Sequence, residues 1–196
     1  MSDQPKSSRA PDRECPHWSG AMRARAHGPE DCYEECLCVE RVIADLFDAF
    51  TDSPIQRLDD AFQQALGRIC GCLKLDMAFL WQFMDEISTS LALTHHYQSH
   101  PDPPIPTLML AEECLPWCHA KLLRGELMVI SSVDQLASDA ARDQEMWRQC
   151  GVGASLLIPL SVGGGPIVGA LWFSATEEDE YEWPDELIRR LQIVAR

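Results

Sequence analysis

The sequence lacks any run of about 18 apolar residues, the length that a membrane-spanning helix needs. It also lacks a short apolar segment behind basic residues near Met1, which a secretory signal peptide would supply. We therefore expect neither a membrane span nor a signal peptide. The expected location is the cytoplasm.

Basic residues are scarce relative to acidic ones. The chain holds 16 Lys and Arg against 31 Asp and Glu, which gives a net charge of −15. The charges of residues 1–30 nearly balance, so the acidic excess belongs to the rest of the chain. Because a surface of that sign repels phosphate groups, we expect no direct nucleic-acid binding. Since the sequence holds no spanning segment, we also expect no membrane partner.

The first 34 residues also lack an apolar period. They are rich in Ser, Pro, Arg and Gly, a composition that cannot bury enough surface to become ordered. A length of 196 residues allows one ordinary domain and a tail. We predict a disordered tail over residues 1–34 and a single domain over residues 35–196.

Nine cysteines are present, but without a secretory signal they do not indicate a disulfide framework. We expect reduced thiols. Cys70, Cys72 and Cys150 fall within helical patterns, where burial as small apolar side chains is the simplest interpretation.

Cys32, Cys36 and Cys38 cluster at the start of the first predicted helix. Exposed thiols at this place would link two protomers or sense oxidants. No nearby group of cations lowers their pKa, so incidental cysteines at a helix start remain the favoured interpretation. Their role stays open.

Two apolar runs joined by glycines define the fold class. Residues 154–162 and 166–173 are rich in Leu, Ile and Val, and Gly163–Gly165 separate them. This pattern predicts an antiparallel hairpin. Since both runs are almost continuously apolar, the hairpin should lie in the middle of a sheet that is covered on both faces.

The helical period appears in three longer segments. Residues 35–50 form the first, and Ser53 and Pro54 then cap and open a second helix that runs to Leu73. A terminal helix opens after Trp183 with acidic residues in its first turn.

Strands and short helices fill the remainder. Strands are predicted over residues 76–84 and 88–98, with a turn at Asp85 and Glu86, and a short strand over 128–131. Four prolines make residues 100–106 a loop. Short helices are predicted from Pro116 to Gly125 and from Ser138, as cap, to Gly151; Ser132 and Gln135 have the capping-box spacing.

This order predicts an α+β domain with a single sheet. The first, second and last helices would cover one face. The loop and the short helices would cover the other, where a pocket can form.

Three segments of the chain together resemble a GAF domain. They are the helix 61–73 leading into residues 76–80, the pair 122–126 and 128–131, and the pair 151–160 and 167–173. The resemblance implies an antiparallel sheet of about six strands with a pocket beneath the short helices. It also implies a sensory module of a histidine kinase, in a two-component system, or of a transcription activator. In such proteins the first and last helices form a dimer and pass the ligand signal to an output domain, whose identity stays open here.

Candidate ligand-binding residues are the aromatic and polar side chains expected around that pocket. Aromatic rings supply flat apolar walls, and histidines supply polar anchors. Each aromatic residue taken singly is more often core than pocket. The candidates are Trp81, His95, Tyr97, Trp117, Cys118, His119 and Trp147.

Cofactor chemistry finds little support. Cys118 and His119 are similar to the bilin-attaching pair of phytochromes, but they lie far upstream of Gly151, and Ala140 and Ala141 occupy the expected place. Cysteines and histidines near Cys118 supply three metal ligands at best, where a closed zinc site needs four. We expect no metal site, and neither bilin, haem nor iron; the cofactor and the ligand stay open.

Two alternatives remain. The domain would be a ligand-free dimerisation module if its own aromatic side chains fill the pocket. It would be an enzyme if it resembles the free-methionine-sulfoxide reductases, with Cys114, Cys118 and Cys150 as attacking and resolving thiols. No catalytic residue is assigned in the leading hypothesis.

Overall fold

The computed structural model describes residues 29–52, 58–84, 89–101, 104–176 and 181–195. The predicted tail up to residue 28, the cap at Ser53 and Pro54, and the turn at Asp85 and Glu86 lie outside these described residues. Within them, no helix combines the length and the apolar character that a membrane crossing needs.

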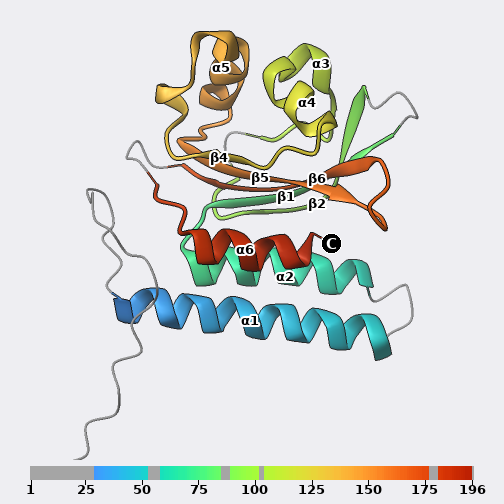
Figure 1. Cartoon of the computed structure of the whole chain (residues 1–196), viewed down its shortest axis with the longest axis vertical. Coiled ribbons are helices and arrows are strands. Elements are labelled where there is room, and N and C mark those ends of the chain that lie inside the picture. The colour runs from blue at the N-terminus through green and yellow to red at the C-terminus, as the bar shows by residue number, and fades with distance from the viewer. Residues whose placement is uncertain (1–28, 53–57, 85–88, 102–103, 177–180, 196) are drawn as a thin grey trace, which may run out of the picture.

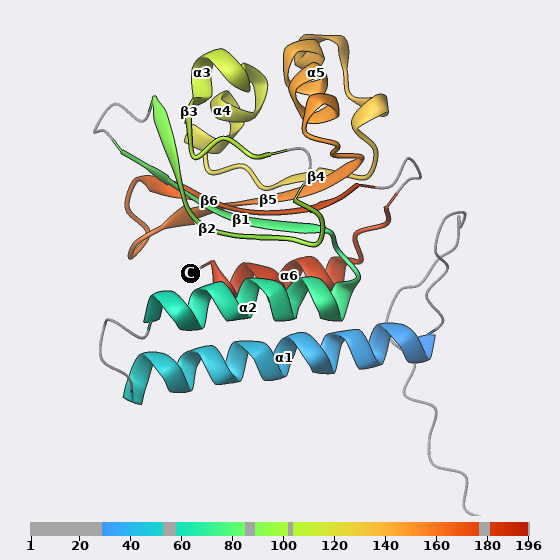
Figure 2. The ribbon, with the colours of Figure 1, turned by 180° about the vertical axis from the view of Figure 1, so that it is seen from behind.

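Helices lie on both sides of one sheet (Figure 1). The long helices form one layer, called the helical layer: α1 (Pro29–Asp52), α2 (Leu58–Leu73) and α6 (Asp185–Val194). The short helices form the opposite layer, called the lid: α3 (Ala111–Cys114), α4 (Pro116–Leu123) and α5 (Ala141–Gln149). The reverse view shows the same layers, with α1 farther from the sheet than α2 and α6 (Figure 2). The predicted α+β class is confirmed.

The sheet has six strands, all paired antiparallel with their neighbours. Their spatial order is β3-β2-β1-β6-β5-β4. The strands are β1 (Met77–Phe83), β2 (Ser90–Gln98), β3 (Leu108–Leu110), β4 (Met128–Ile130), β5 (Ala154–Ser161) and β6 (Ile167–Ala175). The predicted hairpin is therefore β5–β6, and β6 lies at the centre beside β1.

Glycine makes the hairpin turn possible. Gly163 and Gly164 have φ angles of 61° and 74°, in the left-handed region that side chains disfavour. The turn between the two strands therefore needs glycine because its backbone has positive φ angles.

Successive side chains of the central strands β1 and β6 point to opposite faces of the sheet, so the interior consists of two cores. Ala78, Leu171 and Phe173 belong to the core beneath the helical layer. Phe79 and Trp172 belong to the core beneath the lid. Because both faces of β1 and β6 are buried, both runs are almost entirely apolar.

The structure differs from the prediction at several element ends. Helix α1 begins at Pro29 rather than at residue 35, consistent with the preference of proline for a first helical position. The predicted loop is followed by β3 and α3, which are too short to leave a period in the sequence. Neither Ser132 nor Ser138 makes a side-chain cap. Ser132 precedes the 3-10 helix Val133–Gln135, and Ser138 is the first residue of the 3-10 helix Ser138–Ala140.

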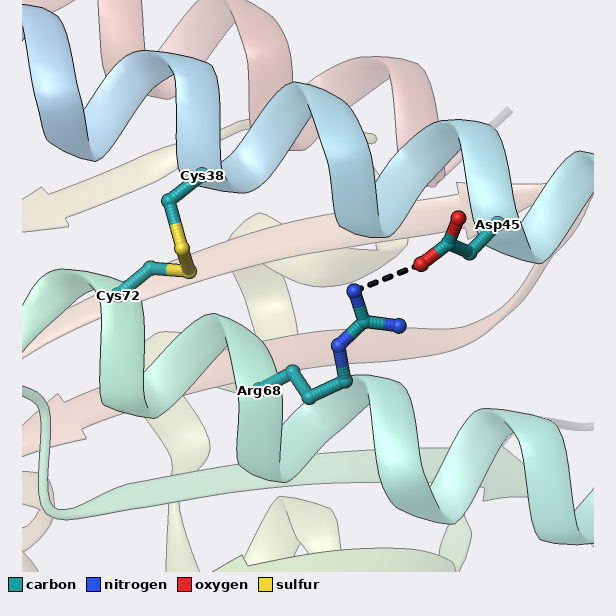
Figure 3. The surroundings of a disulfide bond; sticks show 4 residues. All are labelled: Cys38, Asp45, Arg68 and Cys72. Atoms are coloured by element: carbon teal, nitrogen blue, oxygen red, sulfur yellow. Dashed lines mark ion pairs between the residues drawn. A yellow bond between two sulfur atoms is a disulfide. The ribbon is translucent and has the colours of Figure 1, made fainter.

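The expectation of reduced thiols is wrong for two cysteines. Cys38 of α1 and Cys72 of α2 form a disulfide, with their Cα atoms 5.8 Å apart (Figure 3). Sequence spacing hides this pair because 34 positions separate its members, and only the antiparallel packing of two helices brings them together. Nearby, Arg68 and Asp45 form an ion pair of 2.7 Å between the same helices.

Gly169 in β6 is a position where only glycine fits. A Cβ atom there would lie 2.0 Å from the carbonyl oxygen of Trp81, which belongs to the neighbouring central strand. We expect Gly169→Ala to lower the free energy of unfolding by about 3 kcal/mol or more, because backbone of β1 or β6 must shift. Chemical denaturation measures the change.

The matched control is Gly71→Ala on the exposed side of α2, where an added Cβ meets nothing within 4 Å. Alanine favours the helix there, so stability should rise by about 0.5–1 kcal/mol. Equal effects of the two substitutions would contradict the close β1–β6 approach.

Candidate functional site

The lid face of the sheet is filled by aromatic side chains. The Trp147 ring of α5 meets Trp172 of β6 edge-on at 5.8 Å, and Phe79 meets Trp172 edge-on at 6.2 Å. Trp81 and Trp147 are each 1% exposed. Among the described residues, small cavities of about 20 Å³ lie between the lid and the sheet, one beside Cys118 and one beside Met146. Such a space holds roughly one water molecule.

Two buried indole N–H groups in this core have no partner among the described residues. They belong to Trp81, which lines both small cavities, and to Trp147, which lines one of them. A buried donor without an acceptor costs about 1–3 kcal/mol. By contrast, the indole N–H of Trp172 donates to the hydroxyl of Ser155. The lid face therefore has unused hydrogen-bond donors as well as apolar walls.

Asp143 joins the two larger lid helices. Its carboxylate, fully buried at the start of α5, accepts hydrogen bonds from the backbone N–H groups of Trp117 (3.1 Å) and Cys118 (2.8 Å). These N–H groups belong to the first turn of α4, where helix N–H groups lack internal partners. Burial raises the pKa of Asp143, although the two N–H donors oppose the shift. The charged sequence around Asp143 resembles a solvated helix face, so no sequence signal identifies this contact.

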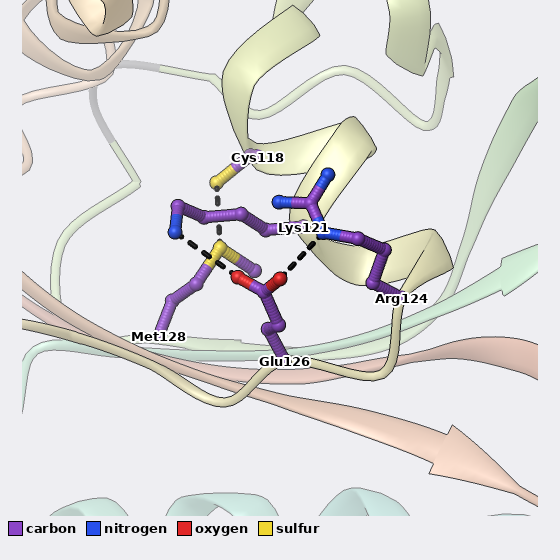
Figure 4. Close-up of polar contacts among 5 residues, drawn as sticks. All are labelled: Cys118, Lys121, Arg124, Glu126 and Met128. Atoms are coloured by element: carbon purple, nitrogen blue, oxygen red, sulfur yellow. Dashed lines mark hydrogen bonds and ion pairs between the residues drawn. The ribbon is translucent and has the colours of Figure 1, made fainter.

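Cys118 lies on the inner side of α4. Its thiol donates to the sulfur of Met128 at 3.6 Å (Figure 4). Burial, with Asp143 nearby, raises the pKa of Cys118 well above its ordinary value. Burial also raises the pKa of Cys150, where Cys114 adds to the shift. Since the thiolate is the nucleophile, these environments weigh against an attacking thiol in the reductase alternative.

The other predicted lid residues have distinct surroundings. His119 is buried and its ring meets Phe83 edge-on at 6.1 Å. Trp117 is half-buried, with the ammonium of Lys121 4.8 Å from its ring centre. Of the predicted site residues, five therefore lie between the lid and the sheet or on the lid: Trp81, Trp117, Cys118, His119 and Trp147.

An ion-pair fork fixes the end of α4 to the approach of β4. Glu126 accepts from Lys121 at 3.1 Å and from Arg124 at 2.5 Å (Figure 4). These two cations lower the pKa of Glu126 to about 2. Gly125, with a φ of 69°, permits the turn between the two elements.

His95 and Tyr97 do not belong to this group, which corrects the prediction of a single pocket. A register shift between Leu80 and Trp81 pairs Trp81 with Leu93 but Leu80 with His95. The extra residue, Thr94, forms a bulge that reverses which face the following side chains meet. His95 consequently faces α2, where its Nε2 lies 3.6 Å from Asp59 and its ring is 5.7 Å from Phe62.

Tyr97 likewise packs against the core beneath the helical layer. A Cβ atom added at Gly67 of α2 would lie 3.1 Å from its ring. Whether any of the seven predicted residues binds a ligand stays a prediction, but His95 and Tyr97 cannot share a site beneath the lid.

A larger hollow lies on this opposite side of the sheet. It has a volume of about 540 Å³ and separates the second half of α1 from the strands. Ile43, Leu46 and Phe47 form its α1 wall, while Leu80 and Leu160 belong to its sheet wall. Most of the lining is apolar, so sequence periodicity assigns these residues to an ordinary core.

The profile of the GAF domain matches residues 57–196. The chain belongs to the GAF domain family. The match begins just before α2, so α1 precedes the matched segment. The predicted resemblance is confirmed. No curated protein matches the chain.

Solved GAF domains share the fold at low sequence identity. The phycocyanobilin-bound GAF domain of a cyanobacterial phytochrome aligns with a TM-score of 0.64 and 14% identity, covering 80% of this chain and 89% of that one. The GAF domain of an Acinetobacter phosphoenolpyruvate-protein phosphotransferase gives 0.59 and 12%, covering 82% and 87%. The chromophore-binding domain of a Stigmatella aurantiaca phytochrome gives 0.59 and 17%, covering 81% and 58%. These similarities establish the fold.

Asp143 is the side chain on which lid geometry depends most directly. We expect Asp143→Ala to lower the free energy of unfolding by about 2–3 kcal/mol, because two N–H groups of α4 lose a charged acceptor. Asp139→Ala is the control: it removes an exposed carboxylate just before α5 and should change stability by less than about 0.5 kcal/mol. Equal effects in urea denaturation would argue against the Asp143 contact.

The same residue predicts a pH dependence. The pKa of Asp143 is higher in the folded chain than its ordinary value, so the folded state binds this proton more tightly than the unfolded state. Its contribution to stability therefore grows as the pH falls. The stability difference between wild type and Asp143→Ala should widen from pH 7 to pH 4 in urea titrations; a narrowing would contradict the raised pKa.

Proposed function

We propose that this GAF domain is a cytoplasmic sensory module of a signal-transduction protein, such as a sensor histidine kinase or a transcription activator. It binds a small molecule beneath the lid and reports the binding through the helical layer. The two unpaired indole N–H groups of Trp81 and Trp147 carry the proposal, because they are donors held ready inside an apolar, aromatic-walled space.

Those donors define the chemistry of the ligand. A molecule with carbonyl, carboxylate or similar oxygen acceptors would satisfy both indole groups, while the rings of Phe79 and Trp172 contact its apolar part. The present cavities of about 20 Å³ each are too small for such a molecule. Ligand binding therefore requires the lid to lift, and it selects an open arrangement over the closed one.

Asp143 makes α4 and α5 move together. Lifting α4 then displaces β4, because the Glu126 fork connects the end of α4 to the approach of that strand. In turn, β4 holds the segment that leads into α6: Trp183 donates its indole N–H to the carbonyl of Ile130, at 3.3 Å, and the backbone N–H of Tyr181 donates to the carbonyl of Ser131, at 3.0 Å. This chain of contacts joins the lid to the helical layer.

The helical layer is suited to pass on such a displacement. Leu187 and Leu191 of α6 are buried in the same core as Val39 and Val42 of α1. A shift of α6 therefore changes how α1 packs. A homodimer formed through these helices would convey the change to an output domain.

A second candidate function is a ligand-free dimerisation module. The edge-on packing of Trp147 on Trp172 favours it, since the chain's own aromatic residues already occupy the lid face. In that case the unpaired indole groups would be satisfied by single water molecules in the two small cavities.

Two variants separate binding from transmission. Trp147→Phe removes one unpaired indole donor from the proposed ligand site beneath the lid. Trp183→Phe removes the hydrogen bond to the Ile130 carbonyl of β4, which belongs to the proposed connection between the lid and the helical layer. Protein isolated under mild conditions is examined by native mass spectrometry for a retained small molecule. That compound is then titrated against each variant.

We expect the compound to bind Trp147→Phe at least tenfold more weakly, a loss of about 1.4 kcal/mol, and to bind Trp183→Phe as it binds wild type. Hydrogen exchange in α6 should respond to the compound in wild type but much less in Trp183→Phe. A protein that is dimeric, carries no small molecule and becomes more stable on Trp147→Phe substitution would instead support the dimerisation module.

A further inference from the structure

The disulfide between Cys38 and Cys72 joins the two helices α1 and α2. Both cysteines are half-buried, on the sides of α1 and α2 that face each other (Figure 3). Their Cα separation of 5.8 Å lies within the usual range for a disulfide, so the bond fits the helix packing. Disulfides are uncommon in reducing compartments, where those that occur are usually transient or redox-sensing.

Two other cysteines, Cys70 of α2 and Cys118 of α4, are unsuited to exchange because they are buried. Cys70 lies two positions before Cys72 on α2 but is fully buried, and burial, with Asp76 nearby, raises its pKa. Cys118 is buried under the lid. Partial exposure therefore distinguishes the Cys38–Cys72 pair from the buried thiols of Cys70 and Cys118.

The disulfide connects the outermost helix, α1, to α2. Helix α1 packs on α2 and α6, farther from the sheet than either (Figures 1 and 2). At one end α1 is joined to α2 by the chain, and the disulfide joins the two helices toward the other end. The hollow of about 540 Å³ lies beneath the second half of α1.

Non-covalent contacts also hold α1. Val39, Val42 and Leu46 form its buried stripe. The Arg68–Asp45 ion pair joins α1 to α2, but its side chains are 50% and 57% exposed, and exposed pairs stabilise little. Among the described residues of α1, loss of the disulfide would leave this buried stripe, the partly buried Ile43 and surface ion pairs to hold the helix.

We propose that Cys38 and Cys72 form a thiol–disulfide exchange site through which the domain senses dithiols and sets how tightly α1 is held on α2. A dithiol thiolate attacks one sulfur of the pair and forms a mixed disulfide, and the cysteine that leaves takes up a proton. The second thiolate of the dithiol then displaces the other cysteine, which is protonated in turn. Two electrons pass to the pair, and the dithiol leaves as its own disulfide.

Oxidation reverses these steps with a small-molecule disulfide as oxidant. The input is separate from the proposed ligand site, because the lid lies on the other side of the sheet. Its test uses no ligand, so its outcome and that of the proposed function are independent.

The experiment equilibrates the full chain with mixtures of reduced and oxidised dithiothreitol. N-ethylmaleimide then traps free thiols, and peptide mass spectrometry locates them. We expect Cys38 and Cys72 to become labelled together as the reduced fraction rises, while Cys70 stays unlabelled. Hydrogen exchange at residues 37–46 of α1 should accelerate at least fivefold on reduction, whereas β5 and β6 keep their protection.

Variants test the assignment. Cys38→Ser and Cys72→Ser should show the fast exchange of α1 in every mixture, and Cys70→Ala should keep the wild-type response. If a serine variant fails to fold, the reduced wild type still supplies the comparison. A pair that resists reduction until the domain unfolds, reduction that leaves α1 exchange unchanged, or a disulfide that proves to join two chains would each overturn the proposal.

Discussion

Burial of both faces of the central strands is the constraint on which the architecture depends. Strands β1 and β6 place apolar side chains on each side, and β1 approaches β6 so closely at Gly169 that the backbone leaves no room for a side chain. A sheet of this kind needs two covering layers. The helical layer covers one face and the lid the other, so each layer contacts the same pair of strands. The two layers therefore pack on opposite faces of one sheet.

Much of this arrangement could be predicted from residue patterns. The glycine-separated apolar runs indicated the central hairpin, and the helical periods indicated α1, α2 and α6. Proline and glycine marked both ends of α4. What escaped prediction depends on contacts between distant residues: Asp143 caps a helix that is not its own, and Cys38 meets Cys72 only when two helices pack antiparallel. Local sequence patterns do not indicate which distant residues will come into contact.

The lid and the helical layer differ in how they are held. The lid is fixed by one buried carboxylate, by aromatic edge-to-face contacts and by the Glu126 fork, all of which can rearrange without breaking a covalent bond. The helical layer has a covalent cross-link as well as an apolar stripe. Contacts of the first kind rearrange quickly and reversibly. A slower change that persists until chemistry reverses it suits the second.

The bulge at Thr94 determines which face of the sheet each half of β2 serves. Before it, Leu91 and Leu93 contribute to the core beneath the lid; after it, His95 and Tyr97 serve the opposite layer. Odd-numbered side chains of β2 thus face the lid before Thr94 and the helical layer after it, because Thr94 is the extra residue of the bulge. If Thr94 instead paired regularly with Leu80, simple alternation would place the imidazole and the phenol beneath the lid, beside Leu91 and Leu93, while every residue kept its identity. The bulge, rather than the composition of the strand, determines here which side of the sheet receives these two side chains.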